Sequence, residues 1–119
     1  MVKSLRGAIF LKENSIEEIN DKAVKLYLGL LEKNNIKEED IISLIITHTS
    51  DLTKRNSATS LRKAGLAENI CLMCVQEANI DSSAPLVIRM LLTIETNNKT
   101  LHPVYLNGAE KLRPDLKQS

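Results

Sequence analysis

Apolar residues recur along this chain with two different periods, and these periods divide it into helices and strands. Spacings of three and four residues over 15–34 predict an amphipathic helix with one packed face. The apolar residues of that face are Ile16, Ile19, Ala23, Leu26, Tyr27, Leu30 and Leu31. Ser15 and Glu18 predict a capping box at its start, and Asn34 with Asn35 predicts its end.

Shorter apolar segments predict strands over 2–9, 41–47, 69–76, 86–96 and 102–107. The segment 41–47 is apolar almost throughout, which is typical of a strand buried on both faces. Residues 36–40 form a connector. A second, short helix is predicted over 57–64, with Ser57 as its cap and Gly65 at its end.

This order of elements predicts an α+β domain with one mixed sheet of about five strands and both helices on one face. In the strand from Leu86, alternation places one purely apolar set of side chains on the helix side. The set is Ile88, Met90, Leu92 and Ile94. The opposite face is mixed and has no predicted cover, which favours oligomerisation. The length predicts a single domain, 1–119, that ends in a polar and possibly mobile tail at 108–119.

Composition excludes several classes of protein. The chain has 16 basic and 15 acidic residues and three aromatic ones, so no basic stripe or stacking platform for nucleic acid is expected. No apolar segment approaches the roughly 20 residues that span a bilayer, and no secretory leader is apparent, which predicts a cytoplasmic protein. Cys71 and Cys74 lie inside a predicted strand, and His48 and His102 are isolated, so redox and zinc chemistry are disfavoured.

Two charged residues, Glu77 and Arg89, stand in or beside apolar strands. Such a charge is costly unless it is paired or faces a site. Either a structural ion pair or a functional site would explain them. Arg6 is a similar case in the first strand, where an arginine extending from an edge strand to water is the structural alternative. The small residues after it, Gly7 first, indicate a close backbone approach or a bend. Cys74 and Glu77 would face opposite ways on a straight strand, so a site using both needs Glu77 beyond the strand end or a bulge.

Five short motifs carry a resemblance to one family over nearly the whole chain. They are Leu5-Arg6-Gly7-Ala8, Cys74-Val75-Gln76-Glu77, Ile88-Arg89-Met90, Val104-Tyr105-Leu106 and Leu112-Arg113-Pro114-Asp115-Leu116. In this order and spacing the chain closely resembles the monofunctional AroH-class chorismate mutases.

The resemblance implies a homotrimer with a barrel-like core, of chorismate mutase/Rid-like architecture, with active sites at the subunit clefts. It implies an isomerase that converts chorismate to prephenate, a step toward phenylalanine and tyrosine. The reaction is a unimolecular [3,3] rearrangement without metal, cofactor or covalent intermediate. The expected partners are therefore the small-molecule substrate chorismate and further copies of the chain.

The resemblance also implies roles for individual residues. Arg89 would stabilise negative charge on the breaking ether oxygen, and Glu77 would accept the ring hydroxyl. Arg6 and Tyr105 would hold the side-chain carboxylate. The remaining substrate-binding positions implied are Cys74 near the ring hydroxyl, Ala58, Thr59 and Arg62 around the short helix, and Leu112 and Arg113 in the tail.

The chain departs from the family pattern in two regions. Residues 9–13 read Ile-Phe-Leu-Lys-Glu where the family usually has a Thr-rich segment leading to Glu. Asn56 and Thr59 stand where the family commonly has Phe and Lys, which predicts a raised KM rather than a lost kcat. Two other functions remain open at this point. One is a non-catalytic trimeric protein that binds a chorismate-like dianion, and the other is an imine deaminase of the Rid type on a similar scaffold. The Cys74 and Leu112 motifs argue against the deaminase.

Overall fold

The computed structural model describes residues 1–114. Their elements confirm the predicted α+β order. The strands are β1 (Val2–Phe10), β2 (Ile41–His48), β3 (Cys71–Gln76), β4 (Val87–Glu95) and β5 (Val104–Leu106). The α-helices are α1 (Ile16–Lys33) and α2 (Ser57–Lys63), and the 3-10 helices are η1 (Glu38–Asp40) and η2 (Ala109–Leu112).

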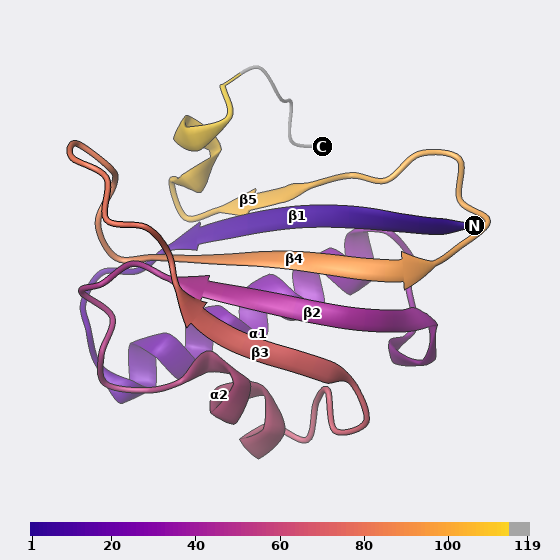
Figure 1. Cartoon of the computed structure of the whole chain (residues 1–119), viewed down its shortest axis with the longest axis horizontal. Coiled ribbons are helices and arrows are strands. Elements are labelled where there is room, and N and C mark those ends of the chain that lie inside the picture. The colour runs from indigo at the N-terminus through magenta and orange to yellow at the C-terminus, as the bar shows by residue number, and fades with distance from the viewer. Residues whose placement is uncertain (115–119) are drawn as a thin grey trace.

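All five strands form one mixed sheet in the order β3-β2-β4-β1-β5 (Figure 1). The central β4 is antiparallel to β1 and β2, while β3 and β5 extend the sheet on either side as parallel neighbours. Helix α1 crosses one face, and no helix crosses the other face within residues 1–114 (Figure 1). Since β1 lies between β4 and β5, Arg6 is not on an edge strand, and the edge-strand explanation of this residue is wrong.

The main core lies between α1 and the sheet. The predicted alternation of β4 is confirmed, because Ile88, Met90, Leu92 and Ile94 are at most 2% exposed. Most of the predicted face of α1 is buried against them, but Ile16 is 42% exposed. Ile16 is the first helical residue, where the helix has not yet reached the sheet. Burial of this aliphatic surface is the dominant driving force for the fold.

The helix starts differ in detail from the prediction. Ser15 Oγ accepts the Glu18 backbone N–H at 3.1 Å, as a cap should. The predicted reciprocal hydrogen bond, from the Ser15 backbone N–H to the Glu18 side chain, is wrong. The Glu18 carboxylate instead accepts the Lys12 N–H at 2.7 Å and pairs with Lys22 at 2.9 Å. These contacts hold the segment that follows β1 against the first turns of α1.

The cap of α2 is Asn56 rather than Ser57. Asn56 Oδ1 accepts the Ala58 backbone N–H at 2.8 Å. The Ser57 hydroxyl is fully buried and lies 2.6 Å from His48 Nε2, so it is occupied elsewhere. His48 is itself only 6% exposed and has a structural position at the end of β2.

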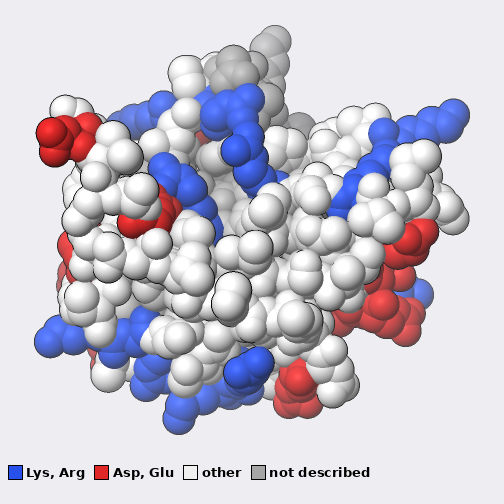
Figure 2. All heavy atoms as spheres, viewed as in Figure 1, with Lys and Arg blue, Asp and Glu red and all other residues white. Residues whose placement is uncertain are grey.

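Strand β2 is buried on one face only, so the prediction of burial on both faces is wrong for the single chain. Leu44 and Ile46 are buried, whereas Ile42 and Ile45 are 47% and 38% exposed. The reason is that both α-helices lie on the same side of the sheet. In Figure 2, which looks onto the opposite side, uncharged residues fill the middle of the face and most charged side chains lie around its margin.

The chain after β5 folds back onto the uncovered face. Gly108 takes a left-handed conformation, with φ of 97°, which turns the chain into η2. Ala109 is fully buried in a second, smaller apolar cluster with Ala8, Val87 and Tyr105. Residues 109–112 of the predicted tail are therefore helical, and the part of that prediction concerning 115–119 lies outside the described residues. Across residues 1–114 no helix combines the length and apolar character needed to cross a membrane.

Candidate active site

Strand register places four residues of the uncovered face in one row across the sheet. Thr47 of β2 is opposite Arg89 of β4, Arg89 is opposite Ala8 of β1, and Ala8 is opposite Tyr105 of β5. Residues directly opposite across strands point to the same side of the sheet. Ala8, which lies between Arg89 and Tyr105 in this row, is fully buried and packs in one apolar cluster with Tyr105. This row is the floor of the candidate site.

Glu77 closes the row at the β3 side. It is the first residue after β3, and its backbone N–H donates to the His48 carbonyl at 2.9 Å. Its carboxylate accepts the Thr47 hydroxyl at 2.6 Å through Oε2 and pairs with the Arg89 guanidinium through Oε1. Glu77 therefore lies beyond the strand end, and its side chain joins the Arg89 side of the sheet. The side chains are partly buried, 19% exposed for Glu77 and 39% for Arg89.

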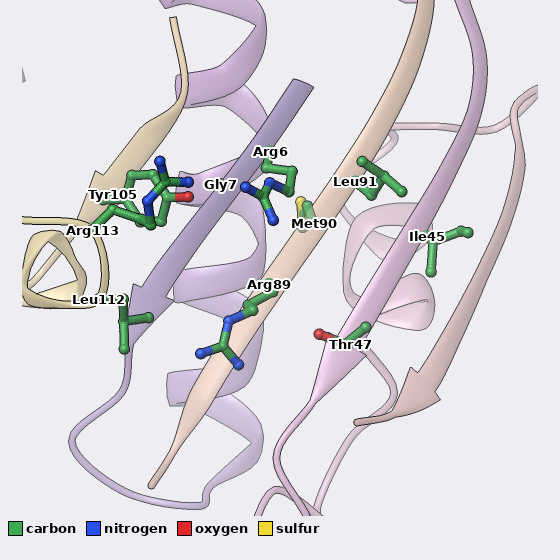
Figure 3. A pocket seen from close by; sticks show the side chains of 10 residues that line it. All are labelled: Arg6, Gly7, Ile45, Thr47, Arg89, Met90, Leu91, Tyr105, Leu112 and Arg113. Carbon is green, nitrogen blue, oxygen red and sulfur yellow. The ribbon is translucent and has the colours of Figure 1, made fainter. Parts of the chain in front are cut away.

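A hollow of about 310 Å³ lies over this row. It is large enough for a small organic ligand. Figure 3 shows its lining side chains, which come from four strands and the segment after β5. They belong to Arg6, Gly7, Ile45, Thr47, Arg89, Met90, Leu91, Tyr105, Leu112 and Arg113.

Three guanidinium groups, those of Arg6, Arg89 and Arg113, line this hollow. Arg89 pairs with Glu77, whereas Arg6 is exposed and makes no ion pair with a described residue. No carboxylate is among the lining residues. The hollow is thus electropositive and fits an anion, with arginine forks suited to carboxylates.

Gly7 allows β5 to pair closely with β1 beside this hollow. A Cβ added at Gly7 would lie 2.8 Å from the Val104 carbonyl oxygen and 3.0 Å from Leu26 Cδ1. The predicted close backbone approach is confirmed. The absence of a side chain lets β1 and β5 pair at Gly7–Val104, which sets Tyr105 one residue further along, level with Ala8.

The other predicted site residues lie elsewhere in the chain. Cys74 lines a separate hollow of about 260 Å³ at the end of β3, beside Asn56. Burial raises the pKa of the Cys74 thiol, against weaker opposing hydrogen bonds from the Ser57 and Ala58 backbone, so the thiol stays protonated at neutral pH. A single chain does not bring Cys74 into the Arg89 hollow.

The residues of α2 belong with Cys74. Ala58 is buried at the helix start, Thr59 is partly buried and Arg62 is exposed. None of the three lines the hollow that contains Arg89. The predicted site residues thus form two groups in the described chain. The Arg89 group comprises Arg6, Glu77, Arg89, Tyr105, Leu112 and Arg113, and the α2 group comprises Ala58, Thr59, Arg62 and Cys74.

Sequence reasoning missed Thr47. Its signal was a lone hydroxyl near the end of an otherwise apolar strand, next to His48. In the structure it is the residue that connects β2 to the Glu77–Arg89 pair. As for metals, residues 1–114 contain no group of three or more His, Cys, Asp or Glu side chains arranged to hold an ion.

Fold and site together define a small α+β domain with an arginine-lined hollow on one sheet face that fits an organic anion. The sequence model of chorismate mutase type I matches residues 2–116, and the chain belongs to that family. It is 35% identical to chorismate mutase AroH of Thermus thermophilus over 122 residues, covering 100% of this chain and 99% of the relative. It is 29% identical to chorismate mutase AroH of Bacillus subtilis (strain 168), covering 98% and 93%.

A solved structure agrees with these sequence relatives. The chain superimposes on a chorismate mutase from Clostridium thermocellum with a TM-score of 0.87 at 34% identity. The match covers 92% of this chain and 98% of that one. The similarity therefore extends over nearly the whole fold.

Proposed function

We propose that this protein is a chorismate mutase, which rearranges chorismate to prephenate for phenylalanine and tyrosine synthesis. The observation that carries the proposal is the position of Arg89. Its guanidinium is fixed by Glu77 at the edge of an electropositive hollow that also holds Arg6. The match to the chorismate mutase family over residues 2–116 supports chorismate as the substrate.

The chemistry needs a fixed cation more than it needs a nucleophile. In the rearrangement the ether C–O bond breaks ahead of C–C bond formation, and negative charge gathers on the ether oxygen. A guanidinium beside that oxygen stabilises the transition state more than the ground state. Arg89 is the proposed cation. The Glu77 ion pair holds it in place before substrate arrives, so little reorganisation is required during the reaction.

Glu77 has a second proposed role. One carboxylate oxygen is held by Thr47 and the other faces Arg89. A carboxylate has lone pairs to spare for a further donor. It would accept the ring hydroxyl of chorismate and face the allylic fragment, where positive charge develops. Thr47 would then act as a positioning residue for this carboxylate.

Arg6, Tyr105 and Arg113 are the proposed groups for the substrate carboxylates. All three line the Arg89 hollow, and Leu112 adds an apolar contact. Holding the side-chain carboxylate at a fixed distance from the ring selects the compact, reactive conformer. We also propose that residues 108–114, which include Leu112 and Arg113, move when the site is empty and close over bound substrate.

We further propose that the protein is a homotrimer with active sites between subunits. Two observations support this. Met73, Ile45 and Leu91 are opposite one another on β3, β2 and β4 and are 58%, 38% and 37% exposed, which forms an apolar strip on the uncovered face. Such strips mark interaction surfaces. The α2 group would complete a site only if it came from a neighbouring copy, since it lies apart from the Arg89 group.

The remaining proposals concern organisation and location. We infer that residues 1–119 make up one catalytic domain. We also infer a cytoplasmic enzyme, and the free thiols of Cys71 and Cys74 support a reducing compartment.

The test is a continuous ultraviolet assay of chorismate loss with purified protein in a buffer that contains a chelator. Saturable turnover that survives the chelator, with prephenate as product, is the expected result. Absence of turnover, with a bicyclic transition-state analogue still bound, would indicate the non-catalytic binding protein instead. Release of ammonia from an imine substrate would indicate the Rid-type deaminase. Sedimentation equilibrium gives the subunit number in the same buffer.

A further inference from the structure

Arg55 carries a buried and unpartnered guanidinium nitrogen. Its Nη1 atom has no hydrogen-bond partner, and among residues 1–114 it is the only buried side-chain nitrogen or oxygen in that condition. Burying a charged group without a partner is costly, so natural structures keep such groups rarely. Its neighbour Lys54 is exposed on the same loop, which shows that a cation at this point of the chain can reach water.

Within the described part of the chain, the hollow beside Arg55 contains no counter-charge. It lines the 260 Å³ hollow with Cys74 and Asn56, and none of the lining residues is acidic. The nearest acidic residue in the loop, Asp51, is already engaged, since its carboxylate accepts the Thr49 hydroxyl at 2.5 Å and the Leu86 N–H at 3.1 Å. His48 also lines the hollow, but burial lowers its pKa and so favours the neutral ring. Arg55 is thus the charged member of the lining at neutral pH.

We propose that Arg55 is a substrate-binding residue, which donates a charge-assisted hydrogen bond to a carboxylate of the bound dianion. This inference rests on the proposed function and deepens it. Arg55 lies in the same hollow as Cys74, one of the predicted substrate contacts. Thr59 of α2 is neutral, so Arg55 supplies a second cation, besides Arg62, to the α2 group from the preceding loop. One guanidinium nitrogen, Nη1, is already desolvated in the empty protein, so part of the cost of dehydrating it for a carboxylate has already been met.

A structural role and a substrate-binding role of Arg55 predict opposite effects of its removal on the stability of the protein. A guanidinium that held the loop would be paired, and its loss would destabilise the protein. A guanidinium with a buried, unpaired nitrogen destabilises the protein, so its loss should not lower stability. The matched variants are Arg55→Met, which keeps the length and apolar stem without charge, Arg55→Lys, which keeps the charge, and Lys54→Met, which removes an exposed charge from the same loop.

The experiment measures kcat and KM for chorismate, the dissociation constant of a bicyclic dicarboxylate analogue by calorimetry, and Tm. Arg55→Met is expected to raise KM and the analogue's Kd by roughly 10- to 100-fold, the range for a lost charge-assisted hydrogen bond, with a much smaller fall in kcat. Its Tm is expected to equal or exceed that of the wild type. Arg55→Lys should recover part of the affinity, and Lys54→Met should leave both constants within about twofold, as expected for an exposed charge.

The results separate the two hypotheses. Unchanged analogue binding by Arg55→Met, or an equal loss in Lys54→Met, would overturn the role of Arg55 while leaving mutase activity intact. A wild-type protein that binds the analogue without turning over chorismate would overturn the proposed function, and the Kd values would still decide the role of Arg55. A lower Tm together with unchanged affinity would make Arg55 a structural residue.

Discussion

Glu77 and Arg89 form an ion pair that spans a strand of the sheet. Glu77 follows β3, Arg89 lies in β4, and β2 runs between them. The pair is possible because Thr47 of β2 is opposite Arg89 and donates to the free carboxylate oxygen of Glu77. Three strands therefore contribute to the placement of one guanidinium. Rigid strands position such groups more precisely than loops do.

Replacing Arg89 should damage catalysis more than any other single change. We expect Arg89→Ala to lower kcat/KM by about 10²- to 10³-fold, the usual effect of losing one well-aimed donor to developing negative charge. The ultraviolet assay of chorismate loss measures this. Circular dichroism should show an unchanged fold, because Glu77 keeps its bond to Thr47 and is near solvent. Turnover close to wild type would contradict the assigned role of Arg89.

Thr47 should act through Glu77. The change Thr47→Val keeps the shape and β-branching but removes the 2.6 Å hydrogen bond to Glu77 Oε2. We expect kcat to fall by about 10-fold while KM changes little, since one hydrogen bond to a charged group is worth roughly 1.5–3 kcal/mol and part of it is regained from water. The control is Thr47→Ser, which keeps the hydroxyl and should retain most of the activity. An equal loss in both variants would point to packing instead.

Gly7 should be intolerant of a side chain. In Gly7→Ala the new Cβ would lie 2.8 Å from a backbone oxygen of β5, which cannot move without breaking the β1–β5 pairing. We expect the free energy of unfolding to drop by about 1–3 kcal/mol or more, with a loss of activity as Tyr105 shifts. Denaturant unfolding measures the first effect. Gly29→Ala is the matched control, because its Cβ would find ordinary contacts of 3.5 Å or more and α1 should gain about 1 kcal/mol.

Thr59 should limit substrate affinity. The residue is only partly buried, so a lysine can extend from α2 into solvent without a clash in the empty protein. We expect Thr59→Lys to lower KM for chorismate by about 3- to 10-fold with little change in kcat, since an added cation captures a dianion in both ground and transition states. Steady-state kinetics at two salt concentrations measure the effect, and the gain should shrink at higher salt. A gain equally large with Thr59→Gln would exclude charge as its cause.

His48 should make stability depend on pH. Burial lowers its pKa in the folded state, and the Leu52 backbone and the Glu77 charge oppose this only in part. The unfolded state therefore binds the proton more readily. The stability contributed by the neutral ring is fully present above the unfolded pKa of about 6.5 and is lost as pH falls through the lower folded pKa. Urea unfolding at several pH values should show this decline, and it should be smaller in His48→Gln. An identical pH dependence in the two proteins would rule out His48 as the source.

The sequence by itself determined the class of fold and most of its elements. Hydrophobic periodicity is a local property, so α1, the alternation of β4 and the close approach at Gly7 could all be predicted from neighbouring residues. The charges of Arg6, Glu77 and Arg89 also stood out locally, because a charge in an apolar strand needs a partner or a site. The family motifs that contain these residues then indicated the reaction.

Tertiary structure alone decided how the site residues combine. Strand order and register are long-range properties, and they brought Thr47, Arg89, Ala8 and Tyr105 into one row from four separate strands. The same sheet separates the Arg89 group from Cys74 and α2. The sequence motifs could not indicate this separation, because both groups match one family pattern. The sequence also could not show which hydrogen bond the Ser57 hydroxyl would make. Ser57 does not cap α2, because its hydroxyl hydrogen-bonds to His48 instead. The unpartnered Arg55 nitrogen is likewise a consequence of packing, which sets burial by the whole chain rather than by adjacent residues.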